Sequence, residues 1–142
     1  MNSTQRLLTR ISALHENLQR IREALQQADD ATLLGDPVRL AALKWHLLLA
    51  LEDAFALCNQ AVAILGGEPP SAYAECFERL AARSIVDAEL SNRLQAMARF
   101  RNLLLHRYWE VDDQRVLQIA RNDLGDLERF VGVLSVHLNL GA

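Results

Sequence analysis

The segment from Arg101 to Tyr108 combines side chains that move protons with side chains that bind phosphate. It reads Arg-Asn-x-x-x-His-x-Tyr, with Arg101, Asn102, His106 and Tyr108 at the named positions. Imidazole transfers protons near neutral pH. A fixed guanidinium stabilises the negative charge that builds on a phosphate under attack. Arg101 and His106 therefore have the types needed for a catalytic pair that cleaves RNA, and the scheme requires no metal ion and no cofactor.

The charge around this segment supports a phosphate site. The whole chain has a net charge of −3, which argues against a protein that coats nucleic acid with its entire surface. Between Glu89 and Glu110, however, no acidic residue occurs, and four arginines are present: Arg93, Arg99, Arg101 and Arg107. We predict that Arg99 and Arg107 contact RNA phosphates.

The spacing of the motif sets a geometric problem. Residues five apart, such as Arg101 and His106, lie about 140° apart around a regular helix and do not share a face. Their convergence would need the long reach of arginine, a distorted helix end, or a second copy of the chain. Asn102 precedes His106 by one turn, so it can orient the imidazole or donate to phosphate. Tyr108 follows Arg101 by seven residues and is expected close to its face.

Apolar stripes and capping residues predict about five helices that would carry this segment. No stretch alternates with the period of two that strands require. Short connections between long helices favour an antiparallel bundle, so the expected fold class is all-α. The predicted helices run from Ser3 to Ala28, from Asp36-Pro37 to just before Gly66-Gly67, from Ser71 to about Ala82, from Asp87 to about Tyr108, and from Asp112 through Leu138. A turn is expected at Asp29-Asp30 and Leu34-Gly35.

Length and composition are those of an ordinary globular domain. The chain has 142 residues, of which 51% are apolar and 23% charged, and we expect one domain over residues 1–142. Apolar runs such as Leu47–Leu51 are shorter than a membrane span, and no signal peptide is evident, so we expect a cytoplasmic protein without a membrane partner. Cys58 and Cys76 are expected as two separate core residues, because disulfides are unusual in the cytosol.

A longer stretch around the motif resembles the HepT family of HEPN proteins. It comprises Phe100 to Tyr108, then Glu110-Val111-Asp112 and Arg115-Val116. The upstream segments that match the same pattern are Pro70-Ser71-Ala72-Tyr73, Phe77-Glu78-Arg79-Leu80 and Leu94-Gln95-Ala96-Met97-Ala98. The resemblance extends from about Ala50 to Ile119.

This resemblance implies an HEPN-type bundle and an RNA-cleaving toxin that forms a homodimer, with two motifs in one cleft. It also implies a partner, a nucleotidyltransferase antitoxin of the MNT type, which neutralises the toxin by transferring AMP to Tyr108. Glu52 falls where the family often carries an acid in the second helix, whereas Ala56 stands where an aspartate is common. By its position beside the apolar stripe, Glu52 either holds Arg101 or is a solvated edge residue.

Two other classes of function stay open at this point. One is a HEPN module that binds RNA or a nucleotidyltransferase without cutting, and the other is a plain helical dimerisation protein. The sequence contains neither Glu-x-x-His, as in di-metal bundles, nor a glycine-rich phosphate loop. Trp45 and Trp109 are expected to be packing residues, although Trp109 could instead stack on a base. No function is predicted for His15, His46 or His137.

Overall fold

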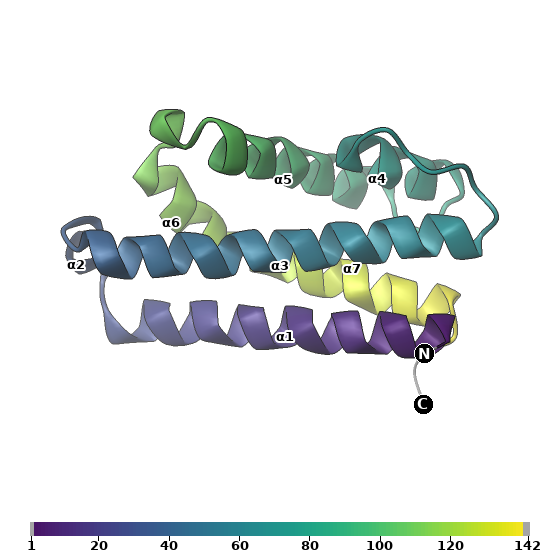
Figure 1. The fold of residues 1–142 in the computed structure, drawn as a ribbon, viewed down its shortest axis with the longest axis horizontal. Helices are drawn as coiled ribbons and strands as arrows, with labels where there is room; N and C mark the ends of the chain where they lie inside the picture. Colours follow the sequence, from purple (N-terminus) through teal and green to yellow (C-terminus); the bar gives the residue numbers. More distant parts are fainter. Residues whose placement is uncertain (1, 141–142) are drawn as a thin grey trace.

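A computed structural model describes residues 2–140, and within that range it contains helices and no strand (Figure 1). The prediction of an all-α bundle is confirmed. The α-helices are α1 (Ser3–Gln27), α2 (Asp30–Leu34), α3 (Pro37–Ile64), α4 (Tyr73–Ala82), α5 (Ala88–His106), α6 (Asp113–Asn122) and α7 (Leu124–His137). One short 3-10 turn, η1 (Tyr108–Glu110), follows α5.

Helix α3 is the central helix of the bundle. It begins where the Asp36 carboxylate accepts hydrogen bonds from the backbone N–H groups of Val38 and Arg39, both at 3.2 Å. Helix α1 lies alongside most of its length, while α4, α5 and α7 pack against its other faces (Figure 1). By length and composition α3 could cross a membrane, but 56% of its most apolar stretch is buried inside the bundle. Burial of this kind is what the core helix of a soluble protein shows.

Three phenylalanines connect the helices at the centre of the core. The rings of Phe55 in α3 and Phe77 in α4 lie 5.6 Å apart, and those of Phe77 and Phe130 in α7 lie 5.3 Å apart. Both pairs meet edge to face, the arrangement that the quadrupoles of aromatic rings favour. All three side chains are fully buried, so α4 and α7 are held against α3 through one continuous aromatic contact.

The expectation of two unlinked cysteines is wrong. Cys58 of α3 and Cys76 of α4 form a disulfide, with their Cα atoms 6.2 Å apart. Both are fully buried. The aromatic packing between α3 and α4 brings the two cysteines together, and the sequence separation of 18 residues gave no local sign of it.

Several predicted boundaries also differ from the structure. The turn after α1 contains the one-turn helix α2, which Asp29 caps by accepting from the N–H of Thr32. The expected fifth helix is divided at Asp123 into α6 and α7, and Asp123 and Asp126 both pair with Arg93 of α5. Helix α5 ends at His106 rather than Tyr108, since the Arg107 backbone leaves helical geometry and the N–H of Glu110 bonds to its carbonyl.

Candidate active site

Arg101 is held in place by side chains from two other helices. It lies on α5, and its side chain is only 15% exposed. Its Nε donates to the Oε1 of Glu52, which comes from α3. Its Cζ lies 5.0 Å from the centre of the Tyr73 ring, at the start of α4. The guanidinium therefore has a fixed orientation before any ligand arrives.

Asn102 has a different neighbour from the one its spacing predicts. Its Oδ1 accepts from Nη1 of Arg101 at 3.0 Å, so the amide acts on the adjacent arginine rather than on the His106 imidazole. A helix places residues one apart about 100° from each other, and the long arginine side chain bends across that angle. Asn102 and Glu52 together engage two of the three guanidinium nitrogens.

His106 occupies the last position of α5 and is exposed to solvent. Helix α5 stays regular up to that residue, so no distortion brings His106 toward Arg101. The Arg101 side chain is committed to Glu52 and Tyr73, which are on other helices. Within one chain, the structure does not bring the two predicted catalytic residues together.

Tyr108 and Trp109 project from the 3-10 turn that follows α5. Tyr108 is 70% exposed and Trp109 is 68% exposed, and their rings meet edge to face at 5.4 Å. The expected place of Tyr108 on the same helix as Arg101 is therefore wrong. The prediction that both tryptophans are packing residues is not met either, since Trp45 on α3 is also 57% exposed.

The four arginines of the acid-free segment have different partners. Arg93 pairs with the buried carboxylate of Asp126 at 2.8 Å, and this hydrogen bond is the main cause that raises the pKa of Arg93. Its guanidinium is therefore already paired with an acid of the same chain. Arg107 pairs with Glu110 at 2.7 Å, although both groups are well exposed. Arg99 is exposed on α5.

A second acid on α3 lies beside Glu52 but faces α1 and not α5. Asp53 is buried and accepts from Arg10 (3.1 Å) and Asn17 (3.0 Å), both on α1. These contacts join α1 to α3 and have no link to Arg101. Sequence reasoning did not single out Asp53, whose signal was only its place within the apolar pattern of α3.

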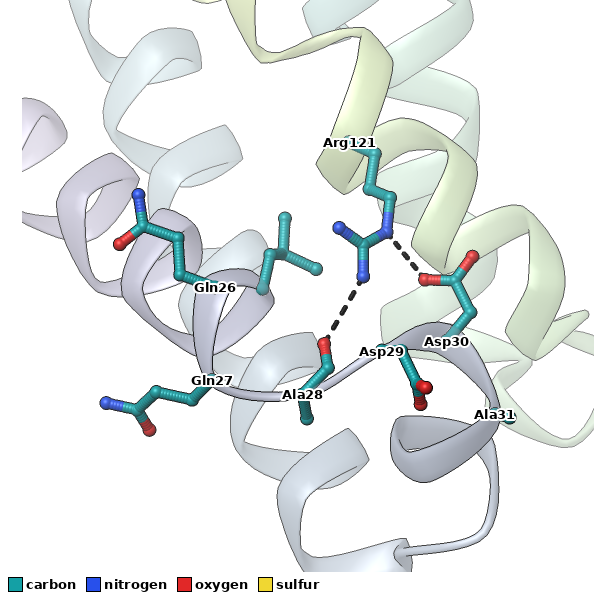
Figure 2. A pocket seen from close by; sticks show the side chains of 8 residues that line it. Gln26, Gln27, Ala28, Asp29, Asp30, Ala31 and Arg121 are labelled. Carbon is teal, nitrogen blue, oxygen red and sulfur yellow. Dashed lines mark hydrogen bonds and ion pairs between the residues drawn. The ribbon is translucent and has the colours of Figure 1, made fainter.

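One surface depression lies apart from this cluster. The turn between α1 and α2 and the end of α6 form it, and Figure 2 shows Arg121 reaching from α6 toward that turn. Arg121 donates to the carbonyl oxygen of Ala28 at 3.4 Å and to the carboxylate of Asp30 at 2.5 Å. None of the predicted site residues lines it.

Comparison with known families matches residues 14–134 of this chain to the model described as "Ribonuclease HepT-like". A relative from Archaeoglobus fulgidus, described as a candidate RNase, is 29% identical over 116 residues. That alignment covers 82% of this chain and 86% of the relative.

Solved structures share the fold. The tri-AMPylated HEPN toxin of Shewanella oneidensis, in complex with its MNT antitoxin, matches with a TM-score of 0.86 and 21% identity over 96% of this chain and 99% of that one. A toxin–antitoxin complex with AMP-PNP matches with a TM-score of 0.85 and 20% identity, over 95% and 99% of the two chains. The cytosolic protein YutE from Bacillus subtilis matches with a TM-score of 0.71 and 17% identity, over 90% of each.

Proposed function

Because this chain belongs to the family of HepT-like ribonucleases, we propose that it is the toxin of a toxin–antitoxin pair and cleaves RNA without a metal ion. The observation that carries the proposal is the fixed guanidinium of Arg101, held by Glu52 and Tyr73 and five residues before the exposed His106. A preorganised cation stabilises developing charge without first having to be oriented. Incubation of RNA with the purified protein in EDTA tests the proposal. A ribonuclease would produce shorter fragments, whereas a module that only binds RNA would slow its migration in a gel and leave its length unchanged.

In the proposed reaction, the RNA itself supplies the nucleophile. The 2′-oxygen attacks the adjacent phosphorus, and the bond from phosphorus to the 5′-oxygen breaks, which leaves a 2′,3′-cyclic phosphate and a 5′-hydroxyl. His106 takes the proton of the 2′-hydroxyl and returns a proton to the departing 5′-oxygen. Arg101 stabilises the charge on the phosphorane oxygens through Nη2, since Nε and Nη1 are engaged by Glu52 and Asn102. Arg99 and Arg107 are proposed to hold flanking phosphates.

We propose that two copies of the chain complete the site. Helix α5 is regular to its end and Arg101 is anchored to α3 and α4, so two of the three routes to convergence are closed. A two-fold axis would place Arg101 of one copy opposite His106 of the other. Large apolar side chains that would otherwise face water are available for such an interface, including Val38, Trp45 and Leu105.

Mixed dimers test this arrangement directly. We expect a dimer of one Arg101→Ala chain and one His106→Ala chain to cleave RNA at about half the wild-type rate, since one of its two sites keeps both residues. The two inactive variants can be co-expressed with different tags and the mixed dimer purified through both. Each variant alone is the control. A mixed dimer no more active than its parents, or a wild-type monomer in light scattering with full activity, would reject the shared site.

The proposed partner is a nucleotidyltransferase antitoxin of the MNT type, which transfers AMP to Tyr108. The high exposure of Tyr108 on a turn next to His106 makes its hydroxyl accessible to another enzyme. We place the protein in the cytoplasm, where its RNA substrate is found. Disulfides are uncommon in that compartment, but both sulfurs of Cys58–Cys76 are fully buried and shielded from soluble reductants.

A further inference from the structure

We propose that Tyr73 is a positioning residue for Arg101, which it holds through the face of its aromatic ring. This inference rests on the proposed role of Arg101 in RNA cleavage. The Arg101 Cζ lies 5.0 Å from the centre of the Tyr73 ring, within the range of a cation–π contact. The Glu52 carboxylate accepts from Nε at the edge of the guanidinium, and the Tyr73 ring contacts the guanidinium at its Cζ. Neither contact alone would fix both the position and the plane of the group.

The Tyr73 ring is itself supported from below. It stacks on the ring of Phe55, with centres 4.6 Å apart and planes at 27°. Phe55 is fully buried on α3, three residues after Glu52, so one turn of α3 carries both groups that determine where Arg101 sits. The buried Phe55 therefore supports the Tyr73 ring, and the Tyr73 ring in turn supports Arg101 at the surface of the site.

The start of α4 is also fixed, which keeps the ring in place. This helix was expected to begin at Ser71, but its N-cap is Ala72, and Ser71 donates from N (2.8 Å) and Oγ (2.5 Å) to Glu75. These bonds, and a smaller contribution from Arg79, lower the pKa of Glu75 to about 2. A lowered carboxyl pKa means that the interaction is intact above the ordinary carboxyl range and is lost only as pH falls toward 2. Near neutral pH, Glu75 is therefore ionised and accepts both hydrogen bonds from Ser71.

Farther along α4, Cys76 is joined to Cys58 of α3 one turn after Tyr73. Tyr73 therefore lies between a local link, from Ser71 to Glu75, and a tertiary link, the Cys58–Cys76 disulfide. A side chain that only filled space would not need a cation on its outer face. The position between the buried Phe55 and the partly exposed Arg101 is what a residue that orients the guanidinium would occupy.

The test separates the ring of Tyr73 from its hydroxyl. Tyr73→Phe keeps the ring, and we expect wild-type kcat and KM. Tyr73→Leu removes the ring, and we expect kcat to fall roughly threefold to thirtyfold with little change in KM, the range that a cation–π contact corresponds to. The conservative variant should therefore rescue activity that leucine loses.

A second readout does not depend on cleavage. This readout is the NMR resonance of the Arg101 Nε–H group. It is assigned as the signal that is missing from the spectrum of Arg101→Lys. In Tyr73→Leu it should shift away from its ring-current position and exchange faster with water, whereas in Tyr73→Phe it should stay near the wild-type position. If the wild type cut no RNA, the proposed function would fail, while this resonance would still decide whether Tyr73 holds Arg101.

Phe77→Leu is the matched control, because Phe77 lies on the same helix and touches Phe55 but is not in contact with the Arg101 guanidinium. The kcat and the Arg101 resonance of all variants are measured at a temperature below every Tm, so that folded proteins are compared. Phe77→Leu should lower Tm yet leave the Arg101 resonance and kcat unchanged. The proposal is overturned if Tyr73→Leu keeps the wild-type resonance, if Tyr73→Phe is impaired as much as Tyr73→Leu, or if Phe77→Leu alters both readouts equally.

Discussion

Replacing His106 by alanine is expected to lower the rate of RNA cleavage by about two to four powers of ten, the usual contribution of a positioned acid or base. Arg101→Ala is expected to have an effect of similar size, because a fixed donor at the developing charge contributes about two to three powers of ten. Both rates are measured on one RNA substrate under single-turnover conditions. If the His106→Ala variant cleaves at the wild-type rate, the catalytic assignment is wrong.

The structure provides a control for each effect. His106 and His137 are both exposed histidines at the last position of a helix, α5 and α7 respectively. A histidine at a helix C-terminus interacts with the helix dipole, so the two alanine variants should lose similar, small amounts of stability. Only His106→Ala should lose activity. Arg101→Lys keeps the charge but not the planar fork, so it should retain the fold and recover little of the rate.

The second large effect concerns neutralisation by the antitoxin. Co-expression with the cognate nucleotidyltransferase should add AMP to the wild-type protein and abolish cleavage, whereas Tyr108→Phe should gain no AMP and stay active. In this transfer the tyrosine oxygen attacks the α-phosphorus of ATP, pyrophosphate leaves, and the phenol proton is released. The attached phosphate would occupy the cleft and pair with Arg101 or Arg107 in place of the substrate.

Intact-mass measurement of the co-expressed proteins decides this prediction. The chain has two tyrosines, so Tyr73→Phe is the matched control. Tyr73 is partly buried beneath Arg101, and this variant should be modified and silenced like the wild type. Modification and full silencing of Tyr108→Phe would show that the acceptor is another residue.

Local sequence signals predicted most of the fold. Asp36, Asp87 and Asp112 each cap the helix expected of them, because an N-cap acts within three residues of itself. Two boundaries that differ involve local contacts, at Asp29 and Arg107, and one involves a contact distant in sequence. At the break, Asp123 pairs with Arg93, which lies on another helix. A periodic apolar pattern continues through such a break and gives no sign of it.

In the site as well, the residue types could be predicted from the sequence, whereas contacts between helices could not. The residue types of the Arg101 motif and the place of Glu52 beside the apolar stripe were visible in the sequence, and the structure pairs the two side chains. The contact of Tyr73 with Arg101 was not visible, since it joins helices whose packing is set by the aromatic core. Exposure of Trp109 also depends on the 3-10 turn, which ends α5 two residues before the pattern predicts.

The products of RNA cleavage test the central claim most directly. Purified wild-type protein is incubated with a short RNA of known sequence in the presence of EDTA, and the fragment ends are identified by mass spectrometry. A parallel RNA carries a 2′-O-methyl group at each cleaved nucleotide. The account predicts that cleavage persists in EDTA, that fragments end in a 2′,3′-cyclic phosphate and a 5′-hydroxyl, and that the methylated RNA stays intact. Cleavage that stops in EDTA, or that leaves 5′-phosphate ends, would contradict a reaction carried by Arg101 and His106.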